Sequence, residues 1–85
     1  MVLPDIILNT NELVVTQVTG SDIVFDTNAS LFGQVKISND LDDRYSASDY
    51  VWFDPEGSVA FTFDSVKYLV INTNKVIFKE NYSAP

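Results

Sequence analysis

The sequence predicts an all-β fold, arranged as a small barrel or sandwich of short strands. Blocks of β-branched and aromatic residues alternate with turn-forming residues along most of the 85-residue chain. No stretch repeats its apolar residues with the helical period of about 3.6 residues, so no helix is expected. A chain of this length forms one domain, and we expect residues 1–85 to share a single thin core.

The N-terminal half contains three expected strands. They cover residues 2–8, 13–18 and 31–38. Pro4 has no amide proton to donate, so the first strand belongs at a sheet edge or starts near this residue. Gly33 has no side chain to pack, so it indicates a bend in the third strand or the close approach of another backbone.

The segment between the second and third of these strands, residues 20–31, is expected to be a mobile loop. Its apolar tripeptide Ile23-Val24-Phe25 follows Gly20-Ser21-Asp22 and precedes the small and polar residues 26–30. Three residues are fewer than a core strand usually contains, and small polar flanks are typical of loops. A short core strand is the alternative interpretation of the same tripeptide.

A polar stretch, residues 39–48, comes next and contains Asp40, Asp42 and Asp43. Carboxylates are ligands of calcium, so a calcium loop is one interpretation of this stretch. It lacks the glycine and the distal glutamate that a calcium loop contains. A solvated polar loop is therefore the preferred interpretation.

The richest strand signals lie between Ser48 and Glu80. Four strands are expected there, at residues 48–53, 58–63, 66–71 and 75–78. Asp54-Pro55-Glu56-Gly57 has Pro second and Gly fourth, which is the preference of a type I turn. Asn72-Thr73-Asn74 supplies another turn, because Asn side chains hydrogen-bond to the nearby backbone. These strands need the N-terminal half, and other copies of the chain, to complete the sheet.

The composition disfavours several classes of function. The chain has no Cys and no His, which excludes disulfides, thiolate and imidazole metal sites and a histidine base. Twelve acidic residues against five basic ones give a net charge of −7, which disfavours binding to nucleic acid. The sequence has no glycine-rich phosphate loop and no distinctive carboxylate pair, so we expect no enzyme activity and no cofactor. Oligomerisation is then the expected source of additional stability.

Two further expectations concern the surroundings of the protein and its aromatic residues. No apolar run approaches the roughly 20 residues of a membrane span, and residues 1–8 do not resemble a signal peptide, so a cytoplasmic location is expected. Several aromatic residues are expected to fill a core or a subunit interface, with a binding platform as the alternative. These residues are Tyr50, Trp52, Tyr68 and Tyr82.

In their order and spacing, roughly residues 8–80 resemble the GroES co-chaperonin family. Ser48-Asp49-Tyr50-Val51-Trp52-Phe53 is similar to the family's Gly-Asp-x-Val-x-Phe strand, with Ser48 in place of the glycine. Residues 68–71 and 74–78 resemble its closing pair of strands. Gly33-Gln34-Val35 stands where the family has Gly-Glu-Val, and Ile23-Val24-Phe25 stands where it carries an Ile-Val-Leu tripeptide on a mobile loop.

The resemblance implies a GroES-like β-barrel that assembles into a ring, expected to be a homo-heptamer. In the family, the ring caps a GroEL-type chaperonin and encloses a substrate protein, while the chaperonin binds and hydrolyses ATP. Ile23, Val24 and Phe25 would then be the residues that bind the chaperonin. The loop is several residues shorter than in the family, and residues 39–48 form only a shortened roof loop. Both features fit a phage-encoded member that acts in the cytoplasm of its bacterial host.

The main alternative is a small acidic phage protein of a different class. It would act as an inhibitor that imitates nucleic acid, or as a component of the virion. An inhibitor of this kind is expected to be a monomer or dimer, whereas a cap is expected to be a ring, so the mass in solution separates the two hypotheses.

Overall fold

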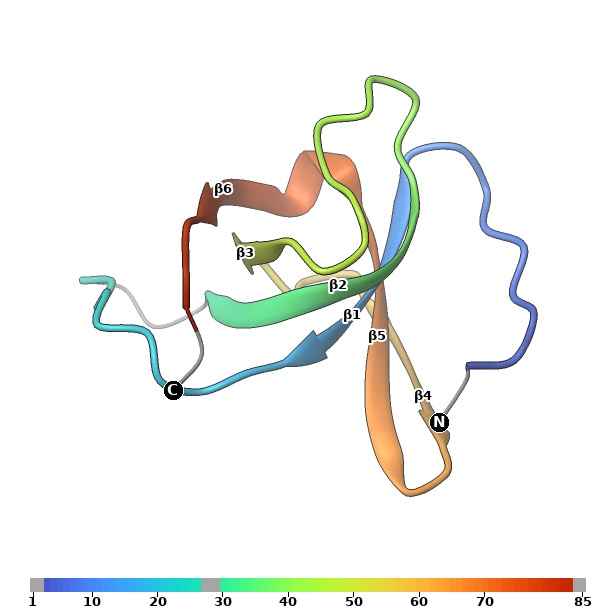
Figure 1. Cartoon of the computed structure of the whole chain (residues 1–85), viewed down its shortest axis with the longest axis horizontal. Coiled ribbons are helices and arrows are strands. Elements are labelled where there is room, and N and C mark those ends of the chain that lie inside the picture. Colours follow the sequence, from blue (N-terminus) through green and yellow to red (C-terminus); the bar gives the residue numbers. More distant parts are fainter. Residues whose placement is uncertain (1–2, 27–29, 84–85) are drawn as a thin grey trace.

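The computed structural model describes residues 3–26 and 30–83, which form one antiparallel sheet of six strands (Figure 1). The strands lie in the order β4-β5-β1-β2-β3-β6, and a short 3-10 helix, η1, joins β5 to β6. Within the described residues, no helix is long and apolar enough to cross a membrane. The elements are β1 (Glu12–Gln17), β2 (Leu31–Asn39), β3 (Tyr50–Phe53), β4 (Val59–Phe63), β5 (Val66–Asn72), η1 (Thr73–Lys75) and β6 (Val76–Glu80).

The all-β prediction is confirmed, and so are six of the seven expected strands. The strand expected at residues 2–8 is wrong, because residues 3–9 have no strand pairing. β1, the next strand along the chain, already pairs with β5 on one side and β2 on the other. Pro4 also cannot donate to a ladder. The segment is instead tied to the sheet by the Asn39 side-chain amide, which donates to the Leu8 carbonyl at 2.9 Å.

The core lies on the concave face of the sheet. It is contributed by β1, β2, β3 and β5, whose inward side chains alternate with outward ones. Two register shifts, at Val14/Val15 in the β1–β2 pair and at Trp52/Phe53 in the β3–β6 pair, interrupt the ladders. Such bulges bend a sheet and increase its twist. The core residues are Leu13, Val15, Val35, Val51, Phe53, Leu69 and Ile71.

The convex face of the sheet is also partly covered. Val14 points away from the core side chains of β1, yet it is fully buried. It pairs with Ile37 of β2 and Val70 of β5. Residues 3–6 line a hollow together with Ile37 and Tyr68, so the N-terminal segment lies over this part of the sheet. The segment that was expected to extend the sheet covers it instead.

Two tight turns set the register of β4. The β4–β5 hairpin closes through Asp64 and Ser65, which both have positive φ (52° and 65°), as a type I′ turn requires. The predicted turn after β3 is present, but its hydrogen bond closes one residue later than expected, from the Ser58 N–H to the Pro55 carbonyl. Gly57 is therefore the third residue, and its φ of 80° fits a type II turn and not type I.

The loop at residues 39–48 is organised around one carboxylate. The Asp40 side chain is fully buried, and it accepts hydrogen bonds from the backbone N–H groups of Asp42, Arg44 and Tyr45 at 2.7–3.2 Å. The Arg44 guanidinium donates to Asp40 and to the Thr73 hydroxyl, which joins the loop to η1. Burial alone would raise the pKa of Asp40, but these hydrogen bonds outweigh it and lower the pKa below its usual value.

We expect Asp40 to make the protein sensitive to acid. Because the folded-state pKa is lowered, its stabilisation is present above the unfolded pKa of about 4 and is lost as the pH falls through the folded value. Asp40→Asn should lower the free energy of unfolding at neutral pH by about 1–3 kcal/mol and flatten its decline below about pH 4. Urea denaturation across the pH range measures both effects. Asp43→Asn, at an exposed residue of the same loop, is the control and should retain the wild-type pH dependence.

The backbone of β1 comes so close to residue 33 that only glycine fits there, and the sequence had indicated a bend or a close backbone approach at this position. A Cβ atom there would lie 2.6 Å from the Thr16 carbonyl oxygen and 3.0 Å from a ring carbon of Phe53. Gly33→Ala should therefore lower the free energy of unfolding by about 1–3 kcal/mol in urea denaturation. Gly57→Asn is the control, since Asn tolerates positive φ and a Cβ at Gly57 meets no atom within 4 Å. Equal stability of the two variants would contradict the predicted clash.

Candidate functional site

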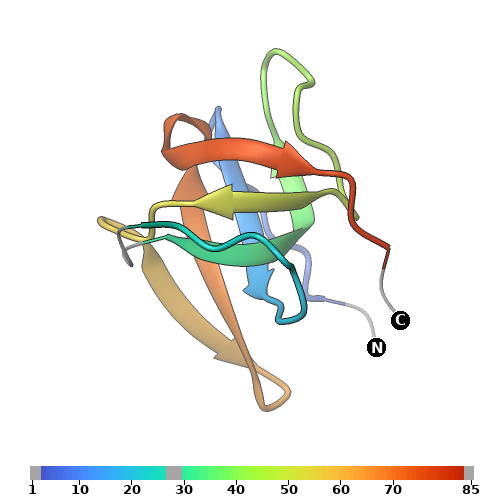
Figure 2. The same cartoon turned by 90° about the vertical axis from the view of Figure 1, so that its left-hand side faces the viewer.

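The candidate site is the loop that follows β1, together with the sheet surface beneath it. The chain leaves β1 after Gln17 and runs across the outer side of the sheet near β2, β3 and β6 (Figure 2). Residues 27–29, which belong to the expected mobile loop at 20–31, lie outside the described residues. The described part, residues 18–26, is in contact with the end of the chain and with β3 and β6.

Three hydrogen bonds fix the first half of this loop and its support. The Tyr82 hydroxyl donates to the Thr19 carbonyl at 3.5 Å. The Ser21 hydroxyl donates to Oε1 of Glu80 at 2.6 Å, and the Trp52 indole N–H donates to the same oxygen at 2.9 Å. One carboxylate oxygen at the end of β6 therefore links the loop to β3.

An aromatic surface lies under the loop, and we refer to it as the aromatic face. Its rings come from alternate, outward-facing residues of β2, β3 and β6 and from the C-terminal tail. The rings from β2, β3 and the tail lie 4.9–5.8 Å from their neighbours between centroids, which is the normal distance for interacting aromatic pairs, and strand pairing places the β6 ring opposite Trp52. The aromatic face consists of Phe32, Tyr50, Trp52, Phe78 and Tyr82.

Phe25 packs against the aromatic face. Its ring centroid lies 4.8 Å from that of Trp52, with an interplanar angle of 63°, and 5.9 Å from that of Phe78. The Phe25 side chain is only partly exposed as a result. Ile23 is 37% exposed and Val24 is 88% exposed. The structure therefore gives the three predicted site residues different environments, because Phe25 contacts the sheet, Ile23 is partly exposed and Val24 is largely exposed.

Three residues of this site, Phe32, Phe78 and Glu80, were not recognised from the sequence. Phe78 and Glu80 are two positions apart in β6, so they share a face, and the register places Phe78 opposite Trp52. The sequence indicates only that Phe78 and Glu80 share one face of the last strand. That they lie beside Trp52 becomes clear once β3 and β6 are paired. Of the four aromatic residues singled out from the sequence, Tyr68 lies elsewhere and stacks on Phe61 at 5.3 Å.

The chemistry available at this site is binding through apolar contacts. The Glu80 carboxylate accepts two hydrogen bonds and is partly buried, while the remaining members of the site are aromatic, aliphatic or hydroxyl groups. Across residues 3–26 and 30–83, no group of three acidic side chains is placed to hold a metal ion. Ile23 and Val24 are exposed on the loop, whereas Phe25 packs on the aromatic face.

No protein-family model and no curated protein matches the chain.

Proposed function

We propose that the protein is a co-chaperonin subunit of the GroES type, whose ring caps a GroEL-type chaperonin through the loop that carries Ile23, Val24 and Phe25. The single observation that carries this proposal is the exposure of Ile23 and Val24 at the surface of a β-domain, on a loop that is otherwise tied down. Exposed β-branched side chains on an anchored loop suit insertion into an apolar groove of a partner.

A single loop of this kind binds weakly. Full burial of an apolar side chain contributes about 1.5–3 kcal/mol, so three give roughly 6 kcal/mol. Ordering each flexible residue costs about 1–2 kcal/mol, so a single loop of about eight flexible residues binds weakly or not at all. Several loops on one ring act together, because the second and later contacts form at a high effective concentration. Weak individual contacts also allow the cap to leave when the chaperonin changes state.

The contact between Phe25 and the aromatic face adds a step to this mechanism. While Phe25 stays on Trp52 and Phe78, the loop is partly ordered before binding, which reduces the entropy lost when Ile23 and Val24 dock. Insertion of Phe25 itself requires release from the aromatic face, and each aromatic pair contributes about 0.5–1.5 kcal/mol beyond its buried area. This cost is small enough to be offset by burial in a chaperonin groove.

The edges of the sheet support assembly into a ring. β4 and β6 are the two ends of the strand order, so each has one edge without a strand partner among the described residues. Val59 on β4 and Ile77 and Phe78 on β6 are exposed apolar residues. Unpaired, apolar edge strands are prone to pair with other chains, and a closed ring satisfies both edges of every copy. We propose the homo-heptamer of the family as the assembled form.

Loss of the exposed apolar residues should abolish capping. In the double variant Ile23→Asp, Val24→Asp, each loop loses about 1.5–3 kcal/mol per side chain, or roughly 10- to 150-fold in affinity for each residue. Co-sedimentation with a GroEL-type chaperonin, with and without nucleotide, measures binding. Ile7→Asp is the matched control, because Ile7 is 91% exposed and lies outside the loop, and it should bind like the wild type.

Equal binding by the loop variant and the wild type would contradict the role of Ile23 and Val24. The mass in solution tests the ring separately. Light scattering should give a mass close to seven subunits, whereas a stable monomer or dimer with no chaperonin binding favours the acidic inhibitor.

The packing of Phe25 on the aromatic face can be measured in the isolated protein. Trp52 is the only tryptophan, so its emission reports directly on this contact. Phe25→Ala should shift the emission of Trp52 to longer wavelength and increase its quenching by acrylamide, because the ring that covers it at 4.8 Å is removed. Val24→Ala changes an exposed neighbour on the same loop and should leave both quantities unchanged. Identical spectra for the two variants would show that Phe25 does not rest on Trp52 in solution.

A further inference from the structure

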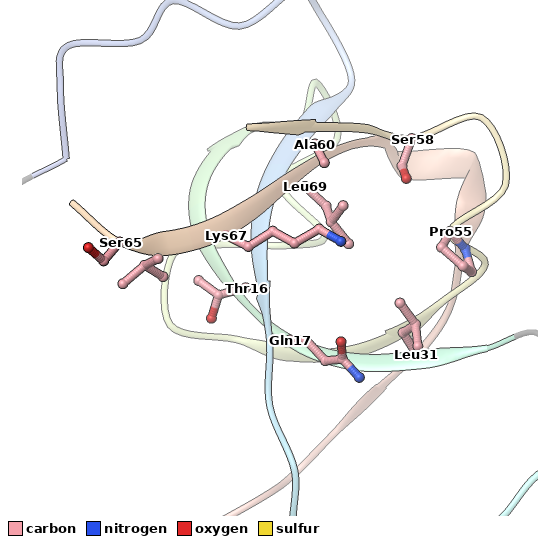
Figure 3. Close-up of a pocket in the computed structure, with 10 residues that line it drawn as sticks. Thr16, Gln17, Leu31, Pro55, Ser58, Ala60, Ser65, Lys67 and Leu69 are labelled. Carbon is pink, nitrogen blue, oxygen red and sulfur yellow. The ribbon is translucent and has the colours of Figure 1, made fainter. Parts of the chain in front are cut away.

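A second surface feature shares no residue with the aromatic face. It is a groove of about 560 Å³ between the β4–β5 hairpin, the end of β1 and the start of β2 (Figure 3). Its volume lies within the range of small-molecule sites. Leu31, Pro55 and Leu69 provide an apolar wall, while Thr16 and Ser58 add hydroxyl groups.

Lys67 is the unusual member of this groove. It stands two positions before the core residue Leu69 in β5, so its side chain leaves the strand on the same face as the core. Figure 3 shows the Lys67 side chain extending into the space that the lining residues surround. Lys67 itself is exposed, so its charged end reaches solvent although the side chain leaves the strand on the face of the core.

The charge of the groove differs from that of the chain as a whole. Twelve of the seventeen charged residues are acidic, yet none of the ten residues that line the groove is acidic. The ion pairs in the described part of the chain involve Arg44 and Lys79, so Lys67 has no carboxylate within 4 Å among those residues. Lys36 donates to the Gln34 side chain on a different part of the surface. The groove thus combines one positive charge, hydroxyl donors and an apolar wall.

We infer that this groove binds a small organic monocarboxylate with an apolar body. The Lys67 ammonium and the neighbouring hydroxyls would receive the carboxylate, and Leu31, Pro55 and Leu69 would contact the apolar part. A single lysine without an arginine suits one negative charge and not a phosphate, which usually recruits several cationic donors. The groove adjoins the loop at Leu31, but the inference does not depend on the proposed capping function.

The experiment uses the full-length chain labelled with nitrogen-15 and octanoate as the probe. Octanoate should shift the amide signals of Thr16, Gln17, Leu31 and Ser58 in a saturable titration. Lys67→Gln keeps most of the side-chain length and removes the charge, so it should weaken binding about tenfold, the loss expected for one charge-assisted hydrogen bond. Lys36→Gln changes the net charge by the same amount away from the groove and should bind octanoate like the wild type. The neutral analogue 1-octanol should bind more weakly than octanoate.

Three outcomes would overturn the inference. The first is the absence of saturable shifts in the groove with octanoate. The second is equal weakening by Lys67→Gln and Lys36→Gln, which would assign the effect to net charge alone. The third is a groove occupied by a second copy of the chain. Light scattering would then give a smaller mass for Lys67→Gln than for the wild type, and octanoate would have no effect. A native amide spectrum for each variant shows that folding is retained.

Discussion

The structure depends on covering both faces of one curved sheet with a chain of only 85 residues. The concave face holds the core, because two bulges bend the sheet around Phe53, Leu13 and the valines of the core. The convex face has no second sheet or helix to cover it in the described part of the chain. Two irregular segments cover it in part, with residues 3–8 near β2 and β5 and residues 18–26 near β3 and β6. The loop proposed to bind a partner is therefore also part of the outer layer.

The sequence predicted the strands well, because β-branched and aromatic blocks between turn residues are a local signal. It predicted the wrong role for residues 2–8, because an apolar run without alternation is compatible with either a strand or a covering segment. The decision depended on β1 already having two partners, which is a property of the whole sheet. The turn after β3 was misplaced by one residue for a similar reason. Gly57 takes the left-handed conformation only when the turn starts at Pro55.

The candidate site was located by the sequence but not described by it. The tripeptide Ile23-Val24-Phe25 identifies the loop, yet its three side chains have different environments. Trp52, Phe78 and Glu80 come together through the β3–β6 pairing, which joins strands about 26 residues apart in the chain. Lys67 could not be recognised either, since only the folded sheet shows that Leu69 faces the core and that Lys67 lines a groove. Long-range pairing, and not residue type, supplied the missing information in each case.

In the proposed ring, the position of β6 would link the subunits. This strand has one edge without a strand partner among the described residues, and it also carries the phenyl ring and the carboxylate on which the loop rests. A neighbouring copy that pairs with this edge would hold β6 in place. It would thereby affect how firmly β6 retains the loop of its own subunit. Departure of one loop would conversely loosen the strand at the subunit boundary. In a closed assembly, such reciprocal linkage favours the concerted attachment and detachment of all loops over independent events.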